Sequence, residues 1–200
     1  MQFTIKTNEL KALLLCAAKN DHRYYLNGAH FESTPNGIIA ASTDGHRLLC
    51  INLPNEQAEG IKCLIPRALI EAAVKTKAQV IDIMIDGQNV TLSSAGQNVS
   101  GSLTEGVFPD FRRVVPQRVT GESGGAQFQT EYISDFDKIG KLINGGKASI
   151  MLNGSMNTAL VKFTDENVIG VLMPLRHYLP TDLTRPDWIE LPAAPMQAAA

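Results

Sequence analysis

The sequence predicts an α+β fold built from three β-α-β-β-β units of about 50 residues each. The first observation behind this prediction is a recurring order: a short apolar strand, an amphipathic helix and three further strands. The second is the set of turn signals, such as "TPNG" and "TDGH", that separate the strands. One unit is too small to close a core, so two units are expected to pack as one domain, with two helices against antiparallel sheet.

The first unit begins with a strand over residues 1–6 and a helix over about 8–19. Apolar residues from Leu10 to Ala17 recur at the i, i+3, i+4 and i+7 spacing of an amphipathic helix. Three strands are expected to follow it, at 28–33, 37–42 and 47–53.

The second unit repeats this order from residue 62. A strand over 62–65 is followed by a helix over 66–75, and proline is favoured at the first position of a helix, where Pro66 stands. Strands over 80–85, 89–94 and 98–103 complete the unit.

The third unit follows a glycine-rich joint at 121–125. Its expected elements are a strand at 126–132, a helix at 134–143, and strands at 148–152, 158–163 and 168–173. The domains are therefore expected as 1–118, a complete domain of two units, and 119–177, a half domain whose single unit has no companion in the chain. The Pro/Ala-rich composition of 178–200 favours a partly flexible extension, whose apolar residues could dock elsewhere. Those residues are Leu179, Leu183, Trp188 and Leu191.

The composition is that of an ordinary soluble protein, with 44% hydrophobic residues, 19% charged residues and a net charge of −2. The three cysteines lack metal-ligand spacing, which favours reduced thiols and a cytoplasmic protein. No stretch approaches the roughly 18 apolar residues that a membrane span needs. The sequence therefore predicts no membrane association, no metal and no cofactor.

The stretch "TDGHRLLC" contains the strongest candidates for catalysis: Asp44 could orient His46 as a base for Cys50. The Asp44-Gly45 pair is, however, a strong hairpin signal, and Cys50 falls within the following strand. None of the common hydrolase, P-loop or dinucleotide-binding motifs occurs. We expect a non-catalytic protein with no catalytic residues, and an enzyme built on these three side chains is the remaining alternative.

Contact with nucleic acid is suggested by two groups of residues. Arg23, Tyr24 and Tyr25 in a loop could stack on bases or contact phosphates, although a packed tyrosine beside a solvated arginine explains them equally well. Basic residues of the predicted helices could follow a phosphate backbone, although a solvated helix face is the alternative. The helix residues considered are Lys11, Lys19, Arg67, Lys75, Lys77, Lys138 and Lys141, of which all but Lys19 and Lys77 are predicted DNA contacts.

Four motifs taken together identify a family resemblance: "RYYLNG" at 23–28, "TDGHRL" at 43–48, "FPDFRRVVP" at 108–116 and "VLMPLRH" at 171–177. They occur in the order seen in the bacterial sliding clamp, the β subunit of DNA polymerase III. Residues 1–115 resemble the middle domain of that family, and 126–176 resemble the second half of its last domain. The first domain and the first half of the last domain have no counterpart here.

The resemblance implies the DNA-clamp fold and a non-enzymatic processivity factor that encircles double-stranded DNA without reading its sequence. It also implies a pocket for short peptide motifs of DNA polymerases and clamp loaders. Carried over residue by residue, the pocket would consist of Leu26, Gly28, Thr43, Gly45, His46, Leu48, Pro109, Arg113, Val114, Val171, Met173, Pro174, Leu175 and Arg176. The residues placed at DNA would be Arg23, Tyr24, Tyr25 and Arg67, whose neighbour, usually basic in the family, is Ala68 here.

An odd number of units predicts a homo-oligomer. Pairing of the third units gives a dimer, and a ring with the family's usual number of units gives a tetramer. The alternative function is an adaptor or decoy that binds polymerase peptides without encircling DNA.

Overall fold

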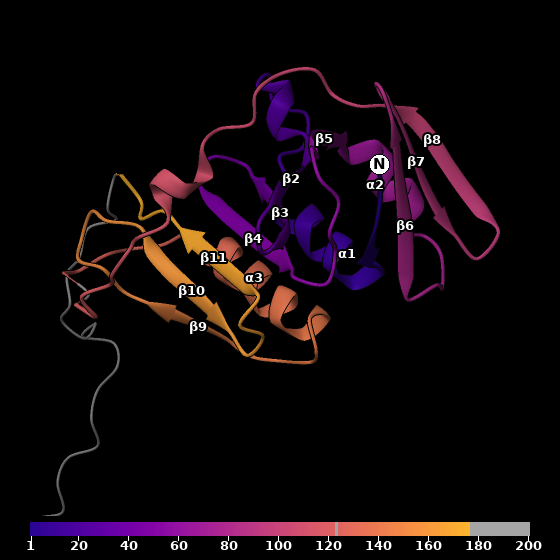
Figure 1. The fold of residues 1–200 in the computed structure, drawn as a ribbon. Coiled ribbons are helices and arrows are strands. Elements are labelled where there is room, and N and C mark those ends of the chain that lie inside the picture. Colours follow the sequence, from indigo (N-terminus) through magenta and orange to yellow (C-terminus); the bar gives the residue numbers. More distant parts are fainter. Residues whose placement is uncertain (123, 177–200) are drawn as a thin grey trace, which may run out of the picture.

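The computed structural model describes residues 1–122 and 124–176, and within them it has two antiparallel sheets and three α-helices (Figure 1). The smaller sheet has the order β1-β6-β7-β8 and the larger one the order β5-β2-β3-β4-β11-β10-β9. This confirms the α+β fold class. The expected extension at 178–200 and residue 177 lie outside the described residues.

The element bounds follow the predicted order closely in the first two units. The first unit contains β1 (Gln2–Lys6), α1 (Thr7–Cys16), the 3-10 turn η1 (Tyr24–Leu26), β2 (Gly28–Thr34), β3 (Gly37–Thr43) and β4 (Arg47–Leu53). The second contains β5 (Lys62–Pro66), α2 (Arg67–Ala73), β6 (Val80–Asp86), β7 (Asn89–Ser94) and β8 (Gln97–Ser102). The remainder contains η2 (Phe111–Val114), α3 (Thr130–Leu142), β9 (Ala148–Met151), β10 (Ala159–Phe163) and β11 (Val168–Leu172).

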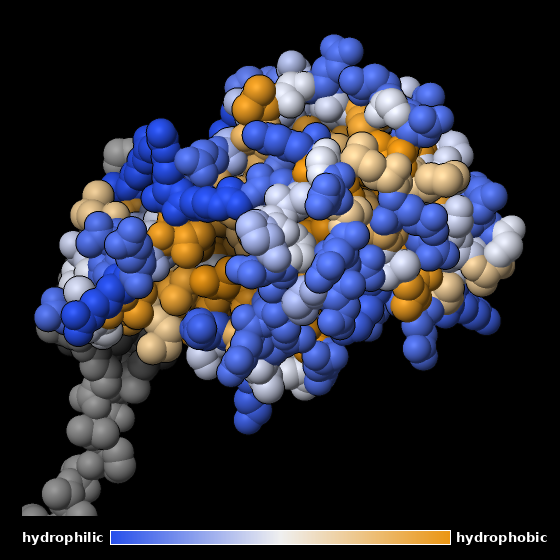
Figure 2. Space-filling view, viewed as in Figure 1, coloured by the Kyte–Doolittle hydropathy of each residue, from blue (hydrophilic) through white to orange (hydrophobic). Residues whose placement is uncertain are grey.

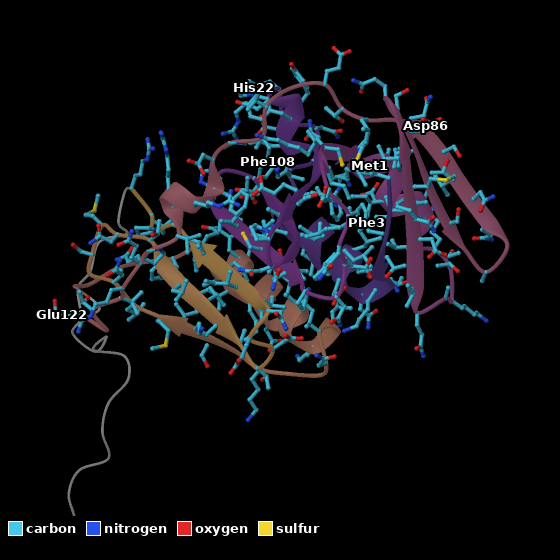
Figure 3. The ribbon with its side chains drawn as sticks, viewed as in Figure 1. Met1, Phe3, His22, Asp86, Phe108 and Glu122 are labelled. Carbon is cyan, nitrogen blue, oxygen red and sulfur yellow. The ribbon has the colours of Figure 1, made fainter. Side chains whose placement is uncertain are left out.

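The first two units exchange their leading strands. β1 of the first unit pairs with β6 of the second, with Phe3 opposite Ile83, and β5 of the second pairs with β2 of the first. Phe3 lies between the two sheets (Figure 3), 5.3 Å from the ring of Phe31, and both side chains are buried. The exchange makes one continuous core from two units that could not close one separately.

The third unit is joined to the first by a strand ladder. β11 pairs antiparallel with β4, with Val168 opposite Ile51 and Leu172 opposite Arg47, and α3 packs against α1. Gly170 of β11 lies under the ring of Phe136 of α3, where a Cβ atom would be only 2.6 Å from the ring. A glycine is therefore required for α3 to sit this close to the sheet.

The prediction of a strand at 126–132 is wrong. Thr130–Leu142 is the helix α3, which starts four residues before the predicted position, and residues 124–129 are outside any strand. The recurring order of elements predicted this strand, but Phe128 and Tyr132 pack against the core from either side of the start of the helix. A strand here would need the partner that β1 and β5 find in a companion unit, and this unit has no such companion within the described residues.

Among the described residues, no helix is long and apolar enough to span a membrane.

Candidate functional site

A pocket of about 150 Å³ lies where the β3–β4 hairpin meets the end of β11. We call it the hairpin pocket. Its walls come from four segments: the η1 loop, the hairpin, residues 109–114 and the end of β11. The lining residues are Arg23, Tyr25, Leu26, Thr43, Gly45, His46, Arg47, Leu48, Pro109, Asp110, Phe111, Val114, Val171 and Met173. Segments from both ends of the described chain thus meet in one apolar hollow.

The hairpin turn is held by its own side chains. The Thr43 hydroxyl donates to the Arg47 carbonyl at 2.6 Å and accepts from the Gly45 amide at 3.0 Å. One Asp44 carboxylate oxygen accepts from the amides of His46 and Arg47, at 2.9 and 3.1 Å. Gly45 has a φ of +93°, a conformation that favours glycine. The hairpin interpretation of Asp44-Gly45 is confirmed.

The same contacts argue against an Asp44–His46–Cys50 catalytic group. The Asp44 carboxylate is used by backbone amides and by the Arg47 guanidinium, which lies 3.0 Å from its second oxygen. The His46 ring instead stacks on Tyr132 of α3, with the ring centroids 6.0 Å apart. Burial raises the pKa of the Cys50 thiol to about 12, so it is not a thiolate at neutral pH.

Arg47 connects the hairpin to the third unit, and the sequence prediction did not include it. Its guanidinium contacts Asp135 of α3 at 2.5 Å and lies 4.4 Å from the centre of the Tyr132 ring. Burial of Asp135 opposes ionisation, but hydrogen bonds from Lys138 and Arg47 outweigh it and lower the pKa of that carboxyl. The sequence did contain a signal for this role. Arg47 lies two residues before Leu49 in the same strand, so its side chain is on the same face of β4, the face toward the helices.

The loop predicted to contact DNA forms part of the pocket rim. The Arg23 guanidinium contacts the Asp21 carboxylate at 2.7 Å and donates to the Asp44 carbonyl at 3.1 Å, which ties the loop to the hairpin. Tyr25 is half-buried and lines the pocket, whereas Tyr24 is 57% exposed. Of the three predicted residues, Tyr24 is the most accessible to a large partner.

The predicted pocket residues divide into two groups. Those that line the pocket are Leu26, Thr43, Gly45, His46, Leu48, Pro109, Val114, Val171 and Met173. Those that lie outside its lining are Gly28, Arg113, Pro174, Leu175 and Arg176. Arg47, Asp110 and Phe111 were missed, and Arg23 and Tyr25, which also line the pocket, had been predicted as DNA contacts instead.

Two residues outside the lining have other structural roles. A Cβ atom on Gly28 would lie 2.3 Å from the carbonyl oxygen of Ile65, so this glycine permits the close β2–β5 pairing. Arg113 is 82% exposed at its side chain and pairs with Asp110 at 3.3 Å.

Most of the predicted helix cations are engaged within the protein. The Arg67 guanidinium donates to the carbonyls of Leu14 and Ala17, at 2.8 and 2.9 Å, and to Glu71 at 2.7 Å. Arg67 therefore caps carbonyl groups at the C-terminal end of α1. Two of the predicted lysines pair with helix carboxylates, Lys138 with Asp135 and Lys141 with Asp137.

The remaining two lysines are more open. Lys75 is exposed just after α2, and Lys11 is half-buried on α1. A cavity of about 700 Å³ between the start of α1 and the end of α3 gathers Lys6, Lys11, Lys77 and Lys141. Glu9 lines the same cavity and pairs with Lys6, and Lys141 pairs with Asp137, so these acids offset part of the positive charge.

Comparison with known proteins identifies the family of the chain. Residues 4–110, more than half of the chain, match the family described as DNA polymerase III beta subunit, central domain. The chain belongs to this family. The family resemblance inferred from the four motifs is thereby confirmed.

The curated relatives of this DNA polymerase III beta subunit family member are beta sliding clamps. The chain is 37% identical to the beta sliding clamp from Pseudomonas putida over 105 residues. This alignment covers 50% of this chain and 29% of the relative. It is 30% identical over 129 residues to the one from Caulobacter vibrioides, covering 58% of this chain and 35% of the relative. The chain thus spans about a third of the length of these relatives.

Solved sliding clamps share the fold over most of the chain. The DNA polymerase III subunit beta of Pseudomonas aeruginosa aligns with a TM-score of 0.71 at 20% identity, covering 88% of this chain and 67% of that one. The sliding clamp of Bacillus subtilis aligns with a TM-score of 0.71 at 17% identity, covering 89% and 65%. The structural match therefore extends beyond the central domain into the third unit.

Proposed function

We propose that this chain is a non-catalytic processivity factor of the sliding-clamp type, which holds a DNA polymerase through a peptide bound in the hairpin pocket. The observation that carries the proposal is the hairpin pocket itself. Although the chain spans about a third of its curated relatives, it brings four separate segments together around one apolar hollow. In this role the protein would act in the cytoplasm, at replicating DNA.

The pocket has the size and chemistry for an apolar side chain of an extended peptide. A cavity of about 150 Å³ accepts a group the size of benzene, and this one has that volume. Its walls are mainly apolar, from Leu26, Leu48, Val171 and Met173, while Arg23 and His46 supply polar groups at the rim. An apolar pocket with a few polar groups at its edge suits a peptide motif from a polymerase or a clamp loader.

We further propose that the partner on the helix side is double-stranded DNA, bound without sequence preference. Lys11, Lys75, Lys138 and Lys141 supply cations on or near the helices, and Tyr24 offers an exposed aromatic ring. With a net charge of −2 and with Lys138 and Lys141 already paired, the attraction would be weak and strongly dependent on salt. Encirclement of the DNA by a ring would then contribute more to retention on DNA than the affinity of these side chains for it.

Ring closure requires association of several chains, as a dimer or a tetramer, with residues 1–118 as the complete domain and 119–177 as the half domain of each. In the described part of the chain the smaller sheet has the edge strands β1 and β8, and the larger sheet has the edge strands β5 and β9. Open edge strands are the usual places where sheets of separate chains join.

Peptide binding is tested by fluorescence anisotropy with a labelled peptide copied from the clamp-binding segment of a bacterial DNA polymerase. His46→Ala and Met173→Ala together are expected to weaken binding by at least tenfold, because they remove a rim contact and part of one wall. Met84→Ala is the matched control, since Met84 is exposed on β6, outside the pocket lining. Equal affinities in all three proteins would refute the hairpin pocket as the peptide site.

The second candidate is an adaptor that binds the same peptides but does not encircle DNA. It is favoured by the engagement of Arg67 within the protein and by the ion pairs of Lys138 and Lys141. Retention on circular and linear DNA of equal length separates the two functions. Longer retention on the circle supports the clamp, and equal retention supports the adaptor.

A further inference from the structure

The segment 104–115, which we call the strap, crosses the outer face of the large sheet and forms one wall of the hairpin pocket. Phe108 and Phe111 are its buried anchors, and Phe108 is labelled in Figure 3. At its ends the Thr104 amide donates to the Leu64 carbonyl at 2.9 Å, and the Val114 carbonyl accepts from the Thr158 hydroxyl at 3.0 Å. The shape of the pocket depends on where the strap lies.

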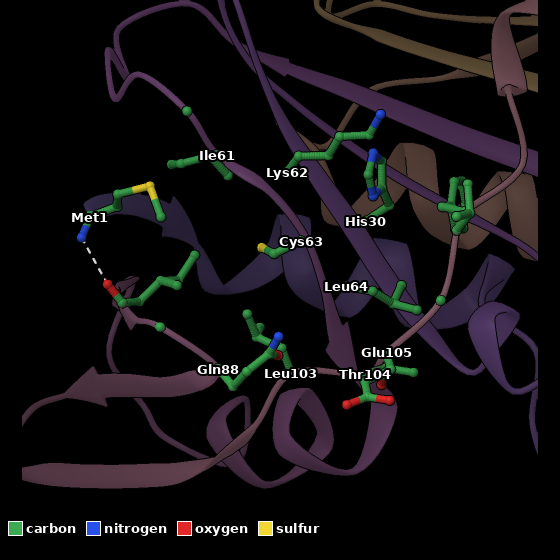
Figure 4. Close-up of a pocket in the computed structure, with 16 residues that line it drawn as sticks. Met1, His30, Ile61, Lys62, Cys63, Leu64, Gln88, Leu103, Thr104 and Glu105 are labelled. Atoms are coloured by element: carbon green, nitrogen blue, oxygen red, sulfur yellow. Dashed lines mark hydrogen bonds between the residues drawn. The ribbon is translucent and has the colours of Figure 1, made fainter.

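The strap has open space on both flanks. On one side is a cavity of about 440 Å³, where Figure 4 shows His30 beside Lys62 and Leu64. On another side is a cavity of about 260 Å³ lined by Ile39, Cys50, Arg112 and Ile169, among others. Figure 2 shows apolar side chains in a hollow over β4, β11 and β10. Because packing around the strap is incomplete, its position needs specific contacts.

Three polar side chains supply such contacts. The His30 ring, 5% exposed, stacks on Phe108 with centroids 4.9 Å apart and planes 4° from parallel. Its Nε2 lies 3.2 Å from a carboxylate oxygen of Glu32, and the other oxygen of Glu32 accepts a hydrogen bond from Arg112 of the strap. The Arg112 guanidinium also lies 4.7 Å from the centre of the Phe111 ring.

The protonation states of His30, Glu32 and Arg112 favour the contacts between them. Burial opposes ionisation of Glu32, but hydrogen bonds from Arg112 and His30 outweigh it and lower the pKa of the carboxyl. Burial lowers the pKa of His30, and the nearby Lys62 acts in the same direction, while Glu32 opposes them. At neutral pH the group is therefore a neutral imidazole, a carboxylate and a guanidinium.

We propose that His30, Glu32 and Arg112 form a clasp that fixes the strap and thereby sets the affinity of the hairpin pocket for its peptide. The inference rests on the proposed function of the pocket. Since none of the three lines the hairpin pocket, they act as positioning residues through the strap. The clasp joins β2 to the strap, so its loss frees the wall that carries Pro109, Phe111 and Val114.

The clasp is tested first without any peptide, by site-resolved alkylation of the cysteines. Cys50 is buried beside Phe111 and Arg112, whereas Cys16 is fully buried at the end of α1 and reports on global unfolding. Arg112→Gln and Glu32→Gln are each expected to speed labelling of Cys50 about tenfold, with labelling of Cys16 unchanged, because only the strap opens. Lys162→Gln is the control, since Lys162 lines the same cavity as Arg112 from β10.

Unchanged labelling of Cys50 in both variants, or a parallel rise at Cys16, would overturn the clasp. So would an equal rise in Lys162→Gln.

The second measurement is the affinity for the labelled polymerase peptide. Arg112→Gln and Glu32→Gln are each expected to weaken binding about fivefold to tenfold. The double variant is expected to bind no more weakly than the weaker-binding single variant, because both substitutions remove the same ion pair. Additive losses, or unchanged affinity despite faster Cys50 labelling, would overturn the positioning role. A wild-type protein that binds no peptide would refute the proposed function instead, and the labelling result would still decide whether the clasp holds the strap.

Discussion

The paired units and the single third unit reach stability by different means. In the first two units the leading strands are exchanged, β1 into one sheet and β5 into the other, so that each unit completes its neighbour. The third unit begins with a helix and has three strands, of which β9 is the edge strand of the larger sheet. It depends on the β4–β11 ladder, on the contact between α1 and α3, and on the ion pairs of Arg47.

This difference explains where the pocket lies. The hairpin pocket is at the junction where the third unit is joined to the pair, and Met173 follows directly after the strand that makes the junction. The Met173 amide donates to the His46 carbonyl at 2.9 Å, so the β4–β11 pairing continues into the pocket wall. A site of this kind is lost if the third unit detaches, which makes the attachment the feature to test.

The largest expected effect comes from Phe136→Ala in α3. Phe136 is 1% exposed and packs over Gly170, so its removal leaves a cavity and is expected to cost about 3–5 kcal/mol. Because Phe136 anchors the third unit, amides of β10 should exchange with solvent faster while those of β2 remain protected. Native-state hydrogen exchange measures both. Equal loss of protection in β2 would show that the two regions unfold as one.

The next effect is expected from Arg47→Met, which removes the cation between Asp44 and Asp135. Removing this cation from two partly buried carboxylates is expected to cost about 3 kcal/mol at neutral pH, although Lys138 still pairs with Asp135. The folded-state pKa of Asp135 is lowered, so its stabilising contribution is present above its unfolded pKa of about 4 and is lost as pH falls through the folded value.

Denaturant titrations at several pH values measure this difference. The stability gap between wild type and Arg47→Met should be largest near pH 7 and shrink below about pH 4. A gap that is constant with pH would mean that the loss comes from packing on Tyr132 rather than from charge.

A smaller effect is expected from Arg67→Ala, which separates a structural role from DNA contact. Loss of the hydrogen bonds to Leu14 and Ala17 should lower the free energy of unfolding by about 1–2 kcal/mol. Retention on DNA should stay as in wild type, whereas Lys75→Ala should weaken it without affecting stability. Thermal unfolding and DNA retention are measured on both variants, and the opposite pattern would place Arg67 at the DNA.

The smallest effect on stability is expected from Met151→Lys on the edge strand β9. Met151 is 41% exposed, so the change should stay within about 0.5 kcal/mol. A lysine on an edge strand opposes sheet joining, so light scattering should show a smaller oligomer than in the control Met84→Lys on β6. Unchanged assembly would exclude β9 as the contact between chains.

The sequence predicted the paired units better than the single one, for physical reasons. In 1–118 the strands β1, β6 and β7 alternate buried residues with more exposed ones, and the β3–β4 hairpin turns at the strong signal Asp44-Gly45, so local pattern and tertiary partner agree. At 126–132 the pattern suggested a strand, but a strand needs a neighbour. The helix forms there instead, with Phe128 just before it and Tyr132 in its first turn both packed against the core.

The candidate site was predicted in its segments and incompletely in its residues. The four motifs include the hairpin, part of the strap and the end of β11, and the structure brings these segments together around the hairpin pocket. Arg47 and Phe111 were missed because their roles arise from the packing of distant segments. Arg67 shows the converse, since a basic residue on a helix reveals nothing of the carbonyls that it caps.

The most direct test of the central claim, that the hairpin pocket binds a partner peptide, is methyl NMR of the methionines during a peptide titration. Met173 lines the pocket, whereas Met84 is exposed on the other sheet and serves as an internal reference. We expect the Met173 methyl signal to shift in a saturable manner on addition of the polymerase peptide, while the Met84 signal does not move. Saturable binding that leaves the Met173 signal unchanged would contradict it.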